Sequence, residues 1–133
     1  MQYYFLDTSA LVKRYHLEVG TDVIDEIFDS VDRVIVISNI SISEFVSTIN
    51  RKKNEKEITQ DDLELVLSKF YADIMEHLTV IGIDDSHTIS SLELILKHNL
   101  KALDSLQLAI ALELSDLDII FVGADSKLCE AAE

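Results

Sequence analysis

Short apolar runs alternate along this chain with segments whose apolar residues recur at helical spacing. Four of the runs are nearly continuous and rich in β-branched or aromatic residues; they cover residues 3–6, 34–37, 78–83 and 119–122. Apolar side chains at successive positions are typical of a strand that is buried on both faces of a sheet. We therefore expect four strands in the interior of the protein.

The segments between these runs predict helices. Leu11, Val12 and Tyr15 follow residue 7 at helical spacing, and residues 59–62 resemble a capping box that opens a longer helix. Further helices are expected from residue 21 onward and over residues 41–51, 86–98, 104–114 and 126–132. Strands that alternate with helices in this way favour an α/β fold, here a three-layer α/β/α sandwich with a central, mostly parallel sheet.

Length and composition fit one domain that spans residues 1–133. The chain is 48% hydrophobic, has no proline and only three glycines, and contains no linker-like stretch. No segment reaches the roughly 18 apolar residues of a membrane span, and the first residues lack the features of a signal peptide. We therefore expect a cytoplasmic protein without membrane contact. Cys129 is the single cysteine, which excludes an intrachain disulfide and a zinc site built from cysteines.

The charge balance restricts the possible partners. The chain has 25 acidic and 11 basic residues, and its net charge is −14. General nucleic-acid binders usually present a broad basic surface to the phosphates, so this composition counts against that class. Any activity on nucleic acid must depend on bound cations and on a local basic strip.

Four acidic residues stand out by their position relative to the predicted strands. Asp7 directly follows the first strand, and Asp125 lies three residues after the fourth. Glu44 is in the first turn of the predicted helix after the second strand, and Asp104 starts the helix that leads to the fourth. Because ligands of open parallel sheets bind beyond the carboxyl ends of the strands, we expect these acids to share one crevice.

The alternative is that each of these acids only caps a helix. An N-cap side chain contributes about 1 kcal/mol to stability, and acids at helix starts are common. Ser41 and Glu44 also have the spacing of a capping box. Position alone therefore does not separate a shared site from four ordinary caps.

A shared acidic crevice favours a divalent cation. Two carboxylates about 5 Å apart repel by roughly 3 kcal/mol at an effective dielectric constant of about 20, so a cluster of four stays partly protonated unless a cation binds. Mg²⁺ suits oxygen ligands and is usually bound through one or two carboxylates, several waters and a substrate phosphate. Mn²⁺ is also compatible with such a site.

Four blocks of sequence around these acids resemble the PIN-domain ribonucleases, especially the toxins of VapBC toxin–antitoxin systems. The blocks occur in the family's order and are FLDTSALVK at 5–13, SISEF at 41–45, ALDSLQLA at 102–109 and FVGADSKL at 121–128. The chain departs from the family at Gly123, where Thr or Ser is common, which leaves the orientation of Asp125 open. Relatives also often carry a further short strand after the last helix.

The resemblance implies magnesium-dependent hydrolysis of RNA phosphodiester bonds. It implies that Asp7, Asp104 and Asp125 are metal ligands and that Glu44 completes the shell or orients the attacking water. It also implies a cognate antitoxin protein that inserts a segment into the active-site groove, and a homodimer. Which RNA is cut, and whether one or two ions act, stays open.

Several polar and basic residues near these acids are candidates for substrate binding. Thr8 and Ser9 could hydrogen-bond Asp7 or a phosphate, although capping the first helical turn is an equal alternative. Arg51 lies seven residues after Glu44, on the same helix face and roughly 10 Å away. Together with Lys13, Arg14 and Lys127, it could form a strip that guides the RNA backbone, and the alternative for each is a solvated helix face.

Three other functions are compatible with parts of the pattern. A magnesium-dependent phosphatase with an aspartyl nucleophile needs a second acid two residues after the first, where this chain has Ser9. A receiver-type signalling domain needs paired acids near the first strand, and Asp7 stands alone there. A PIN-like binding module without activity would not need its acids intact.

Overall fold

The computed structural model describes residues 1–123 and 126–132, and the side chains of all of these except residues 126–128. The predicted alternation of strands and helices is confirmed. The elements follow one another in the order β1 (Gln2–Leu6), α1 (Thr8–Val12), α2 (Thr21–Asp29), β2 (Arg33–Ser38), α3 (Asn39–Asn54), α4 (Gln60–Glu76), β3 (Leu78–Ile81), α5 (Asp85–His98), α6 (Ala102–Glu113), a 3₁₀ turn (Ser115–Leu117), β4 (Ile120–Val122) and α7 (Ser126–Ala132).

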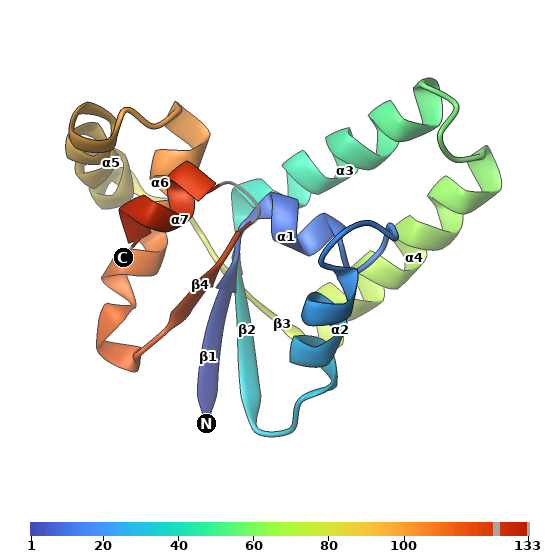
Figure 1. Cartoon of the computed structure of the whole chain (residues 1–133), viewed down its shortest axis with the longest axis horizontal. Coiled ribbons are helices and arrows are strands. Elements are labelled where there is room, and N and C mark those ends of the chain that lie inside the picture. The colour runs from blue at the N-terminus through green and yellow to red at the C-terminus, as the bar shows by residue number, and fades with distance from the viewer. Residues whose placement is uncertain (124–125, 133) are drawn as a thin grey trace.

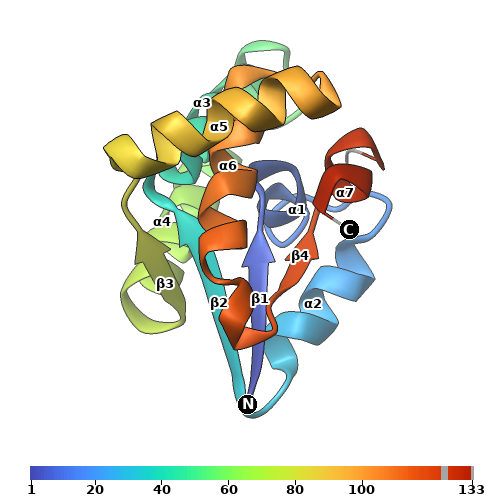
Figure 2. The same ribbon diagram turned by 90° about the vertical axis from the view of Figure 1, so that its left-hand side faces the viewer.

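The four strands form one parallel sheet in the order β3-β2-β1-β4. Helices α1 to α4 cover one face, and α5 and α6 cover the other (Figures 1 and 2). This arrangement is the three-layer α/β/α sandwich that the sequence predicts. Its central strand β1 pairs with β2 through Tyr4 and Ile35 and with β4 through Tyr4 and Ile120, so the carboxyl ends of the strands lie at the same edge.

Side chains on the two faces of the sheet belong to two separate cores, as expected for strands that are apolar throughout. Leu6, Ile35 and Ile37 pack with the helices of the first face, and this core also contains Phe45 of α3 and Phe70 of α4. On the second face, the neighbouring strand residues pack against α6 in a smaller core built on Phe5, Val36, Ile110 and Ala111. Because successive side chains of a strand point to opposite faces of the sheet, the helix layer that each residue at a strand's end faces is also determined.

Two helices that carry candidate acids begin earlier than predicted. Helix α3 begins at Asn39, because the Oγ atom of Ser38 accepts the backbone N–H of Ser41 and caps the helix. The interpretation of Ser41 and Glu44 as a capping box is therefore wrong, and Glu44 lies beyond the first turn. Helix α6 begins at Ala102, so Asp104 lies in its first turn but is not its N-cap.

Other predicted boundaries agree with the structure. Thr59 and Asp62 form the reciprocal capping box at the start of α4, and Asn99 ends α5 in the left-handed conformation. Helix α1 is short and ends at Val12, after which Tyr15 still packs edge-on against Phe45 in the core. Within the described residues, no helix is long and apolar enough to cross a bilayer.

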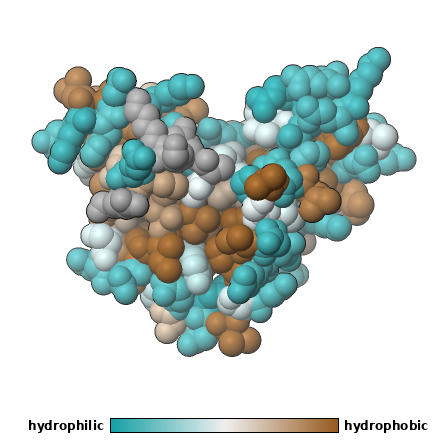
Figure 3. Space-filling view, viewed as in Figure 1, coloured by the Kyte–Doolittle hydropathy of each residue, from teal (hydrophilic) through white to brown (hydrophobic). Residues whose placement is uncertain are grey.

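Helices α3 and α4 extend beyond the sheet as a projecting arm (Figure 1). The outer surface of this arm is mostly hydrophilic, and the molecule is hollowed between the arm and the side formed by α5 and α6 (Figure 3). The hollow lies at the carboxyl end of the strands, which is where the sequence places the candidate acids.

Candidate active site

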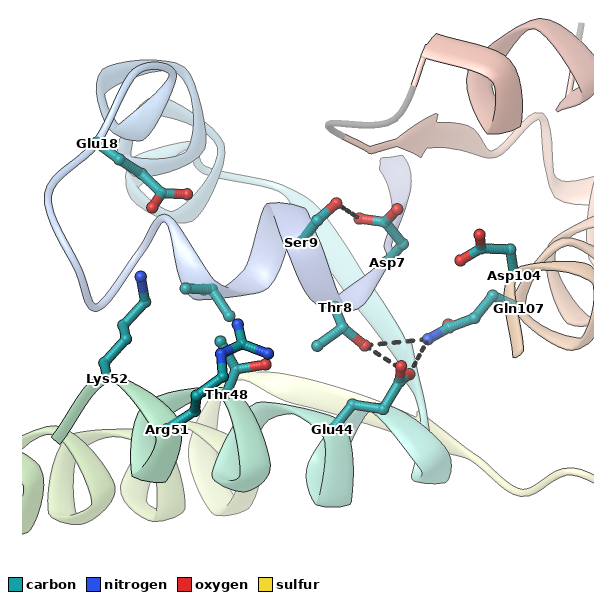
Figure 4. Close-up of a pocket in the computed structure, with 11 residues that line it drawn as sticks. Asp7, Thr8, Ser9, Glu18, Glu44, Thr48, Arg51, Lys52, Asp104 and Gln107 are labelled. Carbon is teal, nitrogen blue, oxygen red and sulfur yellow. Dashed lines mark hydrogen bonds between the residues drawn. The ribbon is translucent and has the colours of Figure 1, made fainter. Parts of the chain in front are cut away.

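Three of the four candidate acids line one cavity of about 420 Å³ that is open to solvent. Asp7 reaches it from the end of β1, Glu44 from α3 and Asp104 from the first turn of α6 (Figure 4). These residues are far apart in sequence and come together because the parallel strands end at one edge of the sheet. The fourth candidate, Asp125, lies outside the described residues.

Asp7 is a helix cap and a cavity residue at the same time. Its side chain is buried, and its Oδ1 atom accepts hydrogen bonds from the backbone N–H of Ala10 at 2.9 Å and from the Ser9 hydroxyl at 2.7 Å. The two interpretations of this acid are therefore not exclusive. Of the two hydrogen-bond partners expected for the Ser9 hydroxyl, Asp7 and a phosphate, the structure shows Asp7.

The electrostatic environment raises the pKa of Asp7 above its ordinary value. Burial is the main cause, and the negative charges of Asp104 and Glu44 add to it, whereas the hydrogen bonds from Ala10 and Ser9 act in the opposite direction. A carboxylate that is buried beside two others favours a bound cation.

The other carboxylate oxygen of Asp7 faces the backbone of Gly123. A Cβ atom at position 123 would lie 2.8 Å from Oδ2 of Asp7, which is closer than such contacts occur. The glycine therefore affects the placement of Asp7. A threonine or serine at this position would require the Asp7 carboxylate to shift.

Glu44 is held by two donors through one of its carboxylate oxygens. Its Oε1 atom accepts the Thr8 hydroxyl at 2.8 Å and the Nε2–H of Gln107 at 3.1 Å (Figure 4). Gln107 is a cavity residue that the sequence analysis did not identify. Two signals could have found it: it lies one helical turn after Asp104, and it is a polar residue between Leu106 and Leu108 in a mostly apolar helix.

Among the described residues, Asp7 and Asp104 form a pair of oxygen donors that fits a divalent cation. In Figure 4 the Asp7 and Asp104 carboxylates face the same part of the cavity. Within residues 1–123 and 126–132, no three acidic, histidine or cysteine side chains are close enough to share an ion. Two carboxylates with waters are a common way to bind Mg²⁺ in proteins, and Asp7 and Asp104 provide such a pair.

The far end of the cavity is basic. Arg51 and Lys52 line it from α3, together with the hydroxyl residue Thr48 (Figure 4). Lys52 also forms an ion pair with Glu57 at 3.4 Å, and Glu18 faces the cavity from the opposite side. The cavity is thus acidic at the sheet and basic along the arm, which suits a substrate that carries several phosphates.

Two other basic candidates lie outside the described lining of the cavity. Lys13 forms an ion pair with Glu18 at 3.2 Å. Arg14 forms one with Asp25 at 2.8 Å and places its guanidinium group over the ring of Phe28. Their contact with a substrate stays a prediction. The side chain of Lys127 is not among those described.

Comparison with known proteins gives one family and several similar structures. A family model described as "PIN domain" matches residues 4–133. No curated protein sequence matches the chain.

The similar structures share the fold at low sequence identity. The VapC20 toxin of Mycobacterium tuberculosis, described as cleaving the sarcin–ricin loop, aligns with a TM-score of 0.71 and 15% identity over 96% of this chain and 94% of its own. PAE2754 of Pyrobaculum aerophilum aligns with a TM-score of 0.67 and 16% identity over 100% and 86%. VapBC2 of Rickettsia felis, solved with a DNA fragment from its promoter, aligns at 0.58 and 16% over 93% and 100%.

Proposed function

The chain belongs to the PIN-domain family, and from this premise we propose that it is a magnesium-dependent endoribonuclease, the toxin of a toxin–antitoxin pair. The observation that carries the proposal is the cavity in which Asp7, Glu44 and Asp104 meet at one end and Arg51 lies at the other. The similarity to VapC20, which is described as a toxin that cleaves the sarcin–ricin loop, supports the same conclusion.

Asp7 and Asp104 are the residues that would hold the cation, and Asp125 is a further candidate. When bound, Mg²⁺ supplies a water activated for attack and neutralises charge that develops on the phosphate; Mn²⁺ can supply the same chemistry. Ser9 and the N–H of Ala10 keep Oδ1 of Asp7 occupied, and its Oδ2 has no hydrogen bond within the described part of the chain.

Glu44 acts on the attacking water in this proposal. Its Oε1 atom is occupied by Thr8 and Gln107, whereas its Oε2 atom has no hydrogen bond within the described residues. A carboxylate held through one oxygen presents the other in a fixed direction, and that oxygen can accept a proton from water. Thr8 therefore helps to hold Glu44 in place, whereas the sequence suggested a contact with Asp7 or a phosphate.

Arg51 binds the RNA backbone in this proposal, with Lys52 beside it. A guanidinium group is suited to bidentate contact with phosphate oxygens. Because the rest of the protein is strongly acidic, we expect weak binding that decreases steeply with salt.

Partners follow from the same family premise. We propose a cognate antitoxin that places a basic side chain among the cavity acids, and a homodimer of the toxin. The similarity to VapBC2, which was solved with promoter DNA, supports the assignment to a toxin–antitoxin pair. The acidic character of the chain is compatible with a basic partner.

Cleavage of RNA by the purified protein tests the proposal. Single-stranded and structured RNA are incubated with the protein in Mg²⁺ or in chelator, beside the variant Asp7→Asn and the control Asp29→Asn, an exposed residue of α2 outside the cavity lining. We expect cleavage only with metal, and a decrease of more than about 100-fold in Asp7→Asn, the scale on which single catalytic groups act. Equal cleavage in chelator or in Asp7→Asn would refute the proposal.

A further inference from the structure

A buried polar network connects the three helices that surround the cavity. Ser38 and Ser41 of the α3 region are fully buried, and Gln107 of α6 is 2% exposed. Polar groups at such depth are costly unless they are hydrogen-bonded, and a complete network fixes the groups it contains in one arrangement. Glu44 is the charged member of this network.

Gln107 occupies the centre of the network. Its Nε2 atom lies 2.8 Å from the Ser41 hydroxyl oxygen, 3.1 Å from Oε1 of Glu44 and 3.2 Å from the Thr8 hydroxyl oxygen. The amide has two hydrogens for these three acceptors. Thr8 itself donates to Glu44 at 2.8 Å, so the carboxylate receives two hydrogen bonds on one oxygen, from α1 and from α6.

The Glu44 carboxylate, which only accepts hydrogen bonds, determines which way the Gln107 amide is turned, and Ser38 binds the amide oxygen. The Ser38 hydroxyl donates to Oε1 of Gln107 at 3.2 Å, while it accepts the backbone N–H of Ser41 at 3.3 Å as the N-cap of α3. A reversed amide would place its oxygen against Oε1 of Glu44 and lose the bond from Ser38. The helix cap and the carboxylate are thus coupled through one side chain.

We propose that Gln107 is a positioning residue for the cleavage reaction: its amide, whose oxygen accepts a hydrogen bond from Ser38, holds Oε1 of Glu44 and so directs Oε2 into the cavity. This inference rests on the proposed nuclease function. Glu44 is on α3 whereas Asp104 is on α6, one turn before Gln107. Gln107 therefore fixes the distance between the two acids as well as the direction of one of them.

A double-mutant cycle separates positioning from a general contribution to folding. The variants are Gln107→Leu, Glu44→Ala, the double variant, and Ser105→Ala as a matched control. Ser105 is a buried polar residue of α6 whose hydroxyl, within the described part of the chain, donates to the carbonyl of Ala102 in its own helix. We expect Gln107→Leu to lower kcat by about 10- to 100-fold with KM within about twofold, as for groups that orient a catalytic side chain.

The decisive result is the double variant. If Gln107 acts through Glu44, the double variant has the activity of Glu44→Ala alone to within about twofold, because there is no carboxylate left to position. Losses that multiply, or a Gln107→Leu variant as active as Ser105→Ala, would overturn the inference. Should Gln107→Leu not fold, Gln107→Met takes its place in the cycle, since it removes the donor and keeps an unbranched side chain of similar length.

A measurement without catalysis distinguishes this inference from the proposed function. The side-chain amide protons of Gln107 are observed by NMR in the wild type, in Glu44→Ala and in Ser105→Ala. We expect two separated, slowly exchanging signals whose chemical shifts change in Glu44→Ala and do not change in Ser105→Ala. Chemical shifts that are the same in Glu44→Ala as in the wild type would overturn the inference. If the wild type cleaves no RNA, the proposed function fails, and this comparison still decides whether Gln107 holds Glu44.

Discussion

At the scale of single residues, the cavity depends on close packing around Asp7. The Oδ1 atom of this carboxylate is fixed by Ala10 and Ser9, and Oδ2 lies against Gly123. The side chain therefore cannot move away from a new atom at position 123 without losing its hydrogen bonds. A glycine at this site is a condition for the observed position of Asp7.

Replacing this glycine should impair cleavage without unfolding the protein. We expect Gly123→Ala to lower the rate of RNA cleavage by at least about 10-fold, because a displacement of even 1 Å in a catalytic group is costly. The control is Gly82→Ala, where the added Cβ would meet only Asn39 at 3.9 Å, an ordinary contact. Full activity in Gly123→Ala at an unchanged melting temperature would show that the close approach has no functional role.

Residue identity also explains why Gln107 is harder to predict from the sequence than the acids. A buried amide is stable only if its hydrogen-bond partners are present. The partners of Gln107 include Ser41 and Thr8, which belong to other helices and are brought close only by the fold. Asp7 and Asp104 could be predicted because each stands in a recognisable block at the end of a strand or the start of a helix. The basic candidates Lys13 and Arg14 are close to Asp7 in sequence, but their ion-pair partners lie in the loop before α2 and on α2, and these contacts depend on the tertiary structure.

At the scale of elements, helix starts are where sequence prediction was least exact. Serines at positions 38, 41 and 43 can each cap a helix. The choice of Ser38 follows from the sheet, because Ser38 is the last residue of β2 and pairs with Ile81 of β3. The strands themselves were predictable from their apolar runs, since burial on both faces leaves little freedom in register.

Helix α5 offers a test of capping that is independent of the cavity. Asp84 accepts backbone N–H groups from Ser86 and His87, and the hydrogen bonds from Ser86 and His87 hold its pKa below the ordinary value. A lowered pKa means that the ionised form stabilises the fold above about pH 4 and that this contribution is lost as the pH falls through the pKa of the folded state.

We therefore expect Asp84→Ala to lower the melting temperature by a few degrees at pH 7, and the difference from wild type to shrink toward pH 3. Asp84→Asn, which keeps a neutral acceptor, should cost less than the alanine variant at pH 7. Thermal unfolding followed by circular dichroism gives all three curves. A difference from Asp84→Ala that is constant over this pH range would contradict the assigned cap.

At the scale of the whole molecule, the acidic surface and the basic end of the cavity act in opposite directions on RNA. The net charge of −14 repels the backbone, whereas Arg51 and Lys52 attract it along one wall of the cavity. Local attraction at short range and repulsion at long range make binding strongly dependent on screening.

This balance predicts a specific effect of Arg51. In an Asp7→Asn background, which keeps the RNA intact, we expect Arg51→Ala to weaken binding and to reduce the slope of log Kd against log salt by about 1, the share of a single phosphate contact. Lys97→Ala on α5, outside the cavity lining, serves as the control. A salt dependence that Arg51→Ala leaves unchanged would remove Arg51 from the RNA-binding surface.

The central claim is that Asp7 and Asp104 together hold the cation that cleavage requires. The rate of RNA cleavage as a function of Mg²⁺ concentration, in the wild type and in Asp104→Asn, tests it most directly. We predict no cleavage in chelator, saturation in the millimolar range for the wild type, and at least about a tenfold higher requirement for Mg²⁺, or no cleavage, in the variant. Cleavage in chelator, or the same magnesium dependence in both proteins, would contradict the account.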